Sequence, residues 1–258
     1  MGHKVSPTCL RLGITTAWGS RWFAPSKKIF LDYLREDYKI RKYLDDELDA
    51  AAVAKIEIER SPDRVLIKVH TARPGVLIGR RGENIQRLQE TIQKMIGAEK
   101  QLKIEYFEIT NAYTEATLIG KSIAFQLEKR VAYRRAMKRA IQQAIEGGAY
   151  GIKIICKGRL AGSEMTRRET YRSGKVPLGT LSAAIDYGTA TAQTTTGTIG
   201  IKVWCYRGEV KRKMAGQVRD FSQRVKVDAP PKAPAAPTVP PAAPRPDTSV
   251  TTDATAAS

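Results

Sequence analysis

Acidic residues are scarce in this chain, and long apolar runs are missing from it. Its 258 residues include 26 Asp and Glu against 44 Lys and Arg, which gives a formal net charge of +18. No apolar stretch approaches the roughly 18 residues that cross a bilayer, and the first residues lack the apolar core of a signal peptide. We therefore expect a soluble protein that stays where it is made. Its excess of bases indicates a polyanionic partner, either nucleic acid or an anionic membrane surface.

Cysteine and histidine are also rare. Cys9, Cys156 and Cys205 are scattered, odd in number and without a CxxC pair, so the sequence predicts neither a disulfide framework nor a zinc site. We expect all three to be reduced and buried. His3 and His70 have no Cys or carboxylate partners at ligand spacing, and no GxxxxGK[ST] motif is present. The sequence therefore predicts no metal, no cofactor and no catalytic residue.

Two glycines frame two arginines in the stretch Gly79-Arg80-Arg81-Gly82. Glycine lets the main chain turn tightly and come close to a ligand, and the arginines supply positive charge. Upstream, Pro74 suits the first position of a short helix. Downstream, helical spacing is shown by the apolar residues Ile85, Leu88, Ile92, Met95 and Ile96. The glycine loop is therefore predicted to join two helices.

The elements around this loop follow a characteristic order. Residues 55–60 alternate in polarity, 61–63 form a turn, 65–70 resume the alternation, and 102–107 predict a further strand. Helical segments lie between residues 26 and 48. The order helix, strand, strand, helix, GxxG, helix, strand resembles a KH domain of the second type, whose loop clamps single-stranded RNA backbone. A GxxG alone could be an ordinary turn, but the element order and the arginines favour the RNA loop.

The first 25 residues are predicted to form an extended arm. It carries the bases Lys4, Arg11 and Arg21 and the aromatic residues Trp18, Trp22 and Phe23. Two hypotheses remain open for these side chains. They could lie along RNA, pairing with phosphates and stacking on bases, or the aromatic residues could dock the arm onto the domain core.

A long basic helix is the second informative feature. Residues 114–146 predict a nearly continuous helix that ends at Gly147-Gly148. Its apolar face comprises Met137, Ala140, Ile141, Ala144 and Ile145. Its opposite face carries Lys129 and the five residues that we call the basic ridge: Arg130, Arg134, Arg135, Lys138 and Arg139.

The last four members of the basic ridge have no acidic residue three or four positions away. Like-charged pairs at this spacing cost a few tenths of a kcal/mol each in an isolated helix, so a merely solvated face would interleave Glu. The pattern therefore predicts a surface that faces RNA phosphates.

A second α+β domain is predicted after this helix. Residues 151–158, 182–191 and 199–206 predict strands. Between the first two of these strands lies a basic connection, either an RNA contact or a flexible surface loop with incidental charge; it carries Arg159, Arg167, Arg168, Arg172 and Lys175. The tail from residue 229 to 258 holds 8 of the 13 prolines and no net charge, which predicts disorder.

The expected fold class is therefore α+β. We divide the chain into a basic arm (1–25), a KH type II domain (26–111), a C-terminal α+β domain (112–210) and a tail (211–258) that is disordered from about residue 229.

Several ordered motifs carry a closer resemblance. They are Gly2-His3-Lys4-Val5-Ser6-Pro7, His70-Thr71-Ala72-Arg73-Pro74-Gly75, Ile78-Gly79-Arg80-Arg81-Gly82, residues 127–139, Gly158-Arg159-Leu160 with Glu164, Ile185-Asp186-Tyr187 and Gly200-Ile201-Lys202-Val203-Trp204. Together they span roughly residues 2 to 210, and they resemble the bacterial-type ribosomal protein S three family of the small subunit.

This resemblance implies a non-enzymatic structural constituent of cytoplasmic ribosomes. Such a protein binds rRNA in the head of the small subunit, neighbours ribosomal proteins S ten and S fourteen, and contacts no membrane. In the family, the residues at Arg134, Arg135 and Lys138 face mRNA where it enters and assist the ribosome in opening its secondary structure. Two alternatives are a free KH regulator of transcripts and an RNA-processing enzyme. The second would need clustered carboxylates or paired histidines, which the sequence does not offer.

Overall fold

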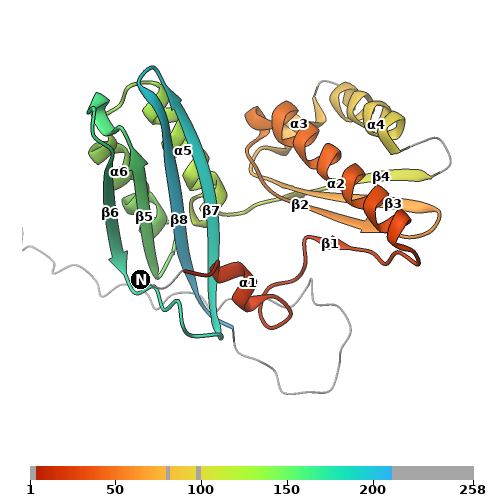
Figure 1. The fold of residues 1–258 in the computed structure, drawn as a ribbon, viewed down its shortest axis with the longest axis horizontal. Coiled ribbons are helices and arrows are strands. Elements are labelled where there is room, and N and C mark those ends of the chain that lie inside the picture. Colours follow the sequence, from red (N-terminus) through yellow and green to blue (C-terminus); the bar gives the residue numbers. More distant parts are fainter. Residues whose placement is uncertain (1–3, 80–81, 97–99, 211–258) are drawn as a thin grey trace, which may run out of the picture.

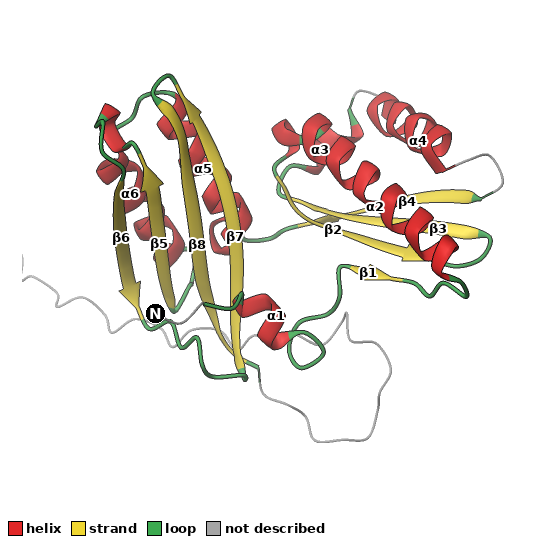
Figure 2. Ribbon diagram, in the orientation of Figure 1, coloured by secondary structure: helices red, strands yellow, loops and turns green. Residues whose placement is uncertain are grey.

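The structure is a computed structural model that describes residues 4–79, 82–96 and 100–210 (Figure 1). The predictions for His3, Arg80, Arg81 and the tail 211–258 lie outside these residues. The described chain forms two four-stranded sheets, and Figure 2 shows each sheet with its larger helices on one face.

The first sheet has the strand order β1-β2-β3-β4, and its element order confirms the predicted KH type II fold. The strands are β1 (Ser20–Arg21), β2 (Val53–Arg60), β3 (Arg64–Thr71) and β4 (Gln101–Glu108), and the helices are α2 (Lys27–Glu47), α3 (Pro74–Ile78) and α4 (Glu83–Ile96). β2 and β3 form an antiparallel hairpin, whereas β4 runs parallel to β3 after the crossover through α3 and α4.

Alternation places one side of each strand in the core of this unit. Val65, Ile67 and Val69 of β3 are completely buried against Ile40 and Leu44 of α2 in one cluster. Burying such side chains stabilises the fold by about 1.5–3 kcal/mol each. The core therefore fixes α2 and the β2–β3 hairpin, and through them the position of the glycine loop.

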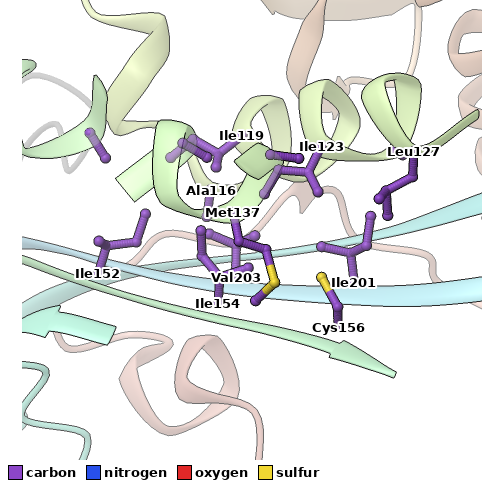
Figure 3. Packing of buried hydrophobic residues seen from close by; sticks show 14 of the residues in the cluster. Ala116, Ile119, Ile123, Leu127, Met137, Ile152, Ile154, Cys156, Ile201 and Val203 are labelled. Carbon is purple, nitrogen blue, oxygen red and sulfur yellow. The ribbon is translucent and has the colours of Figure 1, made fainter. Parts of the chain in front are cut away.

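The second sheet has the order β6-β5-β8-β7, with all neighbouring strands antiparallel. The strands are β5 (Gly151–Gly158), β6 (Arg167–Gly174), β7 (Ala183–Thr194) and β8 (Gly197–Glu209), and the helices α5 (Ala116–Glu128) and α6 (Tyr133–Glu146) cover one face. Figure 3 shows Ile119, Ile123 and Met137 pointing from the helices toward Ile154 and Val203 of the sheet.

Short turns complete the fold. Among the described residues they are the short helix α1 (Pro7–Arg11) and the 3-10 turns η1 (Asp49–Ala51), η3 (Ala112–Thr114) and η4 (Leu160–Gly162). Across the two units, Lys121 of α5 lies 3.8 Å from the carboxylate of Asp45 and 3.5 Å from that of Asp49.

The prediction of one nearly continuous helix over 114–146 was wrong. α5 ends at Glu128, Arg130 has a positive φ of 59°, and α6 begins at Tyr133. The amide of Arg130 donates to the oxygen of Leu127, and the amide of Val131 donates to that of Gln126. These two bonds form a Schellman motif, a helix ending that usually has glycine where this chain has Arg130.

Three smaller expectations also need correction. Residues 167–174, part of the expected basic connection, form the edge strand β6 rather than a loop. Cys9 is exposed, although Cys156 and Cys205 are buried as expected. Ile145, assigned to the apolar face of α6, is 45% exposed.

The arm is not a single extended segment, because α1 and β1 tie it to both sheets. Trp22 donates its indole N–H to Asp37 at 2.9 Å and packs against Phe30 and Tyr33. The docking hypothesis is therefore correct for Trp22. Trp18 and Phe23 are 60% and 87% exposed, which leaves both hypotheses open for them.

Candidate nucleic-acid interface

The basic ridge lies on the solvent side of α6 and on the turn before it. Ala136, Met137 and Ala140 bury one side of the helix against the second sheet. The 3.6-residue helical period then turns the intervening positions outward. All five ridge residues are exposed: Arg130, Arg134, Arg135, Lys138 and Arg139. A depression of about 490 Å³ runs along the four ridge residues of α6 and is lined by Arg134, Arg135, Lys138, Arg139 and Gln142.

No carboxylate in the described part of the chain comes within 4 Å of a charged nitrogen of the basic ridge. Arg134 donates its Nε to the hydroxyl of Tyr133 at 3.1 Å, and this bond is the main cause of its raised pKa. Glu169 of β6 contributes only the weakest of the electrostatic effects on Arg134. The ridge therefore presents its positive charge to solvent, and the described residues supply no carboxylate in contact with it.

The break between α5 and α6 adds to this charge. It creates a helix N-terminus at Tyr133, so Arg134 and Arg135 occupy the first turn of α6, which contains no acidic residue. The macrodipole makes this end of a helix partly positive, and cations there are unfavourable whereas phosphates are favourable. The local backbone and the side chains therefore both favour an anion at the same place.

The glycine loop between α3 and α4 has the backbone that its sequence predicts. Gly79 and Gly82 have φ values of +72° and +80°, where residues with a Cβ are strained. A Cβ on Gly79 would also lie 2.6 Å from the side chain of Asn84, whereas nothing lies within 4 Å of the corresponding point on Gly82. Arg80 and Arg81, between them, lie outside the described residues.

Three of the eight other predicted RNA contacts are engaged inside the protein. Arg11 is completely buried and donates to the main-chain oxygens of Pro7, Pro177, Leu178, Thr180 and Ala183. Arg159 donates to the oxygens of Ser163 and Thr196, and Arg21 pairs with Glu59 at 3.5 Å. The guanidinium of Arg11 has no surface to offer RNA, so we remove it from the candidate interface.

The other five predicted contacts are exposed: Lys4, Arg167, Arg168, Arg172 and Lys175. Three further cations, Lys153, Lys157 and Lys202, escaped the sequence analysis because each is a single base within an apolar strand. They alternate with the buried core residues of β5 and β8, and this alternation is the signal that could have shown that they share a face.

We also searched the described residues for metal sites, reactive thiols and membrane-spanning helices. These residues contain no group of three or more His, Cys, Asp or Glu side chains arranged to hold a metal ion. Burial raises the pKa of the Cys156 and Cys205 thiols to about 12, so both stay protonated and unreactive. None of the helices described is both long and apolar enough to cross a membrane.

The element order, the glycine loop between two helices and the exposed cations define a KH-class RNA-binding protein with an appended α+β domain. Family models agree: residues 39–113 match the KH domain, and residues 123–205 match "Ribosomal protein S3, C-terminal domain".

Similar proteins extend this match over most of the chain. The small ribosomal subunit protein uS3 of Rhodospirillum centenum is 53% identical over 210 residues, which cover 81% of this chain and 92% of the relative. The protein of the same name from Clostridium perfringens is 51% identical, with 81% and 94% covered, and that from Desulfosudis oleivorans is 49% identical, with 81% and 96% covered. The chain therefore belongs to the small ribosomal subunit protein uS3 family.

Proposed function

We propose that this chain is a non-enzymatic constituent of the small subunit of cytoplasmic ribosomes, where it binds rRNA in the subunit head and contacts mRNA where it enters. The relatives' names and the family resemblance support the assembly, and the same resemblance supports ribosomal proteins S ten and S fourteen as neighbours. The observation that carries the RNA contact is the basic ridge, whose charges have no carboxylate partner among the described residues.

The ridge holds RNA by its phosphates. Arg134 and Lys138 are four residues apart and share one helical face, with Arg135 beside them. Each phosphate that they neutralise releases condensed counter-ions, and this gain does not depend on base sequence. Such a grip would keep strands apart once they are separated. Because the sequence has no ATP-binding motif, the work of opening a structured message comes from translocation by the ribosome.

The glycine loop and the exposed bases outside α6 contact rRNA in this proposal. The positive φ values of Gly79 and Gly82 bring the main chain of the loop close to a nucleic-acid backbone. Arg80 and Arg81 supply its charge. Arg21 and Arg159 contribute less than the exposed bases, because intramolecular partners already occupy part of each guanidinium.

The function is tested by changing Arg134, Arg135 and Lys138 together to Ala. All three are exposed, so the fold is expected to survive. A matched control removes three exposed cations from α2, as Lys28→Ala, Lys39→Ala and Lys42→Ala, and changes the net charge equally. The ridge variant should enter small subunits normally but translate a hairpin-containing message more slowly than an unstructured one, and the α2 variant should not.

Two outcomes would contradict the proposal. Equal speed of the ridge variant on both messages would remove the role at the mRNA path. The second is found by sedimenting a cell lysate, in which a ribosomal constituent travels with the small subunits. A protein that stays near the top of the gradient would be a free KH regulator, and this result would contradict the assembly.

A further inference from the structure

Helix α2 exposes a set of large apolar side chains outside the core of the first unit. They are between 41% and 69% exposed, and we call them the α2 stripe: Phe30, Leu31, Leu34 and Tyr38. At about 100° per helical residue, the four side chains share an arc of roughly 100°. The buried residues of α2, which are Asp37, Ile40 and Leu44, lie outside this arc. The stripe is therefore a second apolar side of the helix, separate from the side that packs on the sheet.

Aromatic rings of the arm adjoin this stripe. Trp22 packs against Phe30 with ring centres 5.3 Å apart, and it also packs edge-on against Tyr33 at 5.5 Å. Soluble proteins seldom expose a contiguous apolar patch unless it binds something. The stripe is therefore an interaction surface, and its aromatic character indicates what kind of segment it takes.

The tail of this chain has a sequence of matching chemistry. Within residues 231–240 a proline recurs at every third position, and most of the residues between are small or apolar. The repeating prolines are Pro231, Pro234, Pro237 and Pro240. A polyproline II helix has three residues per turn, so a segment in that conformation presents all four rings on one side. Aromatic-lined surfaces are the usual binding sites of such segments.

The tail leaves the described fold beside the arm. The amide of Val210 donates to the main-chain oxygen of Ser182 at 2.8 Å. The next main-chain oxygen, that of Ala183, accepts the Nε of Arg11 at 2.7 Å. The end of the described chain and the anchor of the arm therefore lie at adjacent residues.

The tail is long enough to reach the α2 stripe from this exit. Residues 12–26 of the arm span the distance from the same place to the start of α2, a path that Figure 1 shows. The tail has a longer segment, residues 211–230, before the first proline of the repeat. Because the maximum span of a chain grows in proportion to its number of residues, the tail can cover at least the distance that the arm covers.

We propose that the proline repeat, residues 231–240, docks on the α2 stripe and covers it in the free chain. Tethering gives the repeat an effective concentration on the order of millimolar at the stripe, so a contact too weak to join two molecules stays closed within one. Both partners offer apolar surface rather than opposite charges, so the contact is insensitive to salt. This inference is independent of the proposed RNA contacts, because it uses no residue of the basic ridge or the glycine loop.

The experiment uses the full chain with a nitroxide label in the tail. Cys9→Ser removes the exposed native thiol and Val239→Cys provides the labelling site, while Cys156 and Cys205 are buried and do not react. Position 239 lies off the side that the four prolines share, so the label does not block docking. The measurement is the loss of intensity of the α2 amide signals in nuclear magnetic resonance spectra when the label is oxidised.

Two variants of this labelled chain test the contact from either side. The repeat variant combines Pro234→Ser, Pro237→Ser and Pro240→Ser. Its control removes as many prolines from other positions of the tail: Pro230→Ser, Pro241→Ser and Pro244→Ser. The stripe variant combines Phe30→Ser and Leu34→Ser. Its control, Phe125→Ser with Ile145→Ser, removes exposed apolar side chains from the second unit. All four stripe-side positions are exposed, so both folds are expected to survive.

The oxidised label should reduce the amide signals of Leu31 and Tyr38 in the parent chain and in both controls. The repeat variant and the stripe variant should lose this effect. The effect should be the same at low and high salt. It should also vanish when the nitroxide and the isotope label are placed on different chains and the two are mixed, because the contact forms within one molecule.

Four results would overturn the inference. The first is an α2 stripe whose signals the label does not reduce in the parent chain. The second is a reduction that passes between mixed chains, which would assign the stripe to a second copy of the protein. The third is an equal loss in the repeat variant and its proline control, which would exclude recognition of the three-residue spacing. The fourth is a reduction that disappears at high salt, which would show that charges make the contact.

Discussion

Arg11 donates its Nε to the main-chain oxygen of Ala183 at 2.7 Å, although 172 positions separate the two residues along the chain. The same guanidinium donates to Thr180 at 2.7 Å and to Leu178 at 3.0 Å. The chain then runs from α1 to β1, which pairs with β2 in the first sheet. One buried arginine therefore fastens an arm that contacts both units of the protein.

Replacing Arg11 by Ala should destabilise the protein by roughly 3 kcal/mol. The change leaves buried main-chain oxygens without donors, and hydrogen bonds to charged groups contribute about 1.5–3 kcal/mol each. Urea unfolding followed by circular dichroism measures the loss. Lys4→Ala removes an exposed cation from the same arm and should change the stability by less than about 0.5 kcal/mol. If both variants unfold at the same urea concentration, Arg11 does not hold the arm.

Arg11 also shows where sequence reasoning ends. Composition and spacing predicted the KH element order and the alternation of Ile199, Ile201, Val203 and Cys205, because both follow from local periodicity. Whether an arginine faces RNA or a set of distant carbonyls depends on contacts between residues far apart in sequence. Local pattern carries no information about such contacts.

The missed helix break and the missed edge strand have the same kind of cause. Residues 128–132 contain no Gly or Pro to mark the end of α5, and Arg130 occupies a conformation that glycine usually adopts. β6 is rich in charge because its outer side faces solvent and it lies at the sheet edge, so its composition is typical of a loop. In both places contacts between residues far apart in sequence outweighed the conformational preference of the local sequence.

Arg130→Gly should stabilise the protein and weaken RNA binding. A residue with a Cβ costs about 1 kcal/mol in the left-handed region, and glycine relieves this strain at the Schellman position. The same change removes one charge from the basic ridge, so the salt slope of RNA affinity should fall by about 0.7. Thermal unfolding and salt titrations measure the two effects. Arg130→Lys keeps both the strain and the charge and should alter neither quantity; a less stable glycine variant would refute the account.

The glycine loop allows charge and backbone strain to be tested separately. If the loop contacts RNA as proposed, Gly82→Asp should weaken RNA binding about tenfold or more. A carboxylate there would repel a phosphate of the RNA, and each lost charged contact is worth about 1.5 kcal/mol. Gly82→Ala introduces the strain of φ +80° without the charge. Gly75→Asp introduces the same charge in α3, one helical turn before the loop begins at Gly79, and nothing lies within 4 Å of the new Cβ.

Both loop controls should retain most of the affinity, and circular dichroism should show that all three variants fold. Gly79→Asp should also weaken binding, but it is a less sharp test because its Cβ would collide with Asn84. Equal affinities of Gly82→Asp and Gly75→Asp would remove the loop from the interface.

His70 should make stability depend on pH just below neutrality. Its ring stacks on Phe107 with centres 5.3 Å apart. Its Nε2 is buried with no hydrogen-bond partner among the described residues and lies 3.9 Å from the carboxylate of Glu57. Desolvation lowers the pKa of His70, Glu57 opposes this shift, and Lys55 and Lys68 add to it. The folded state therefore favours the neutral ring.

The sign of the effect follows from the protons that each state binds. Between the lowered pKa of the folded state and the ordinary value near 6.5, the unfolded chain is protonated at His70 and the folded chain is not. The contribution of His70 is thus complete above roughly pH 6.5 and is lost as the pH falls through the folded pKa. Urea midpoints between pH 5 and 7.5 should decline toward acid in the wild-type chain. In His70→Gln the decline should be shallower. Glu57 stays ionised throughout this pH range, because its pKa is lowered from 4.5. Parallel curves for the two proteins would show that burial of this imidazole does not control the acid side of the stability profile.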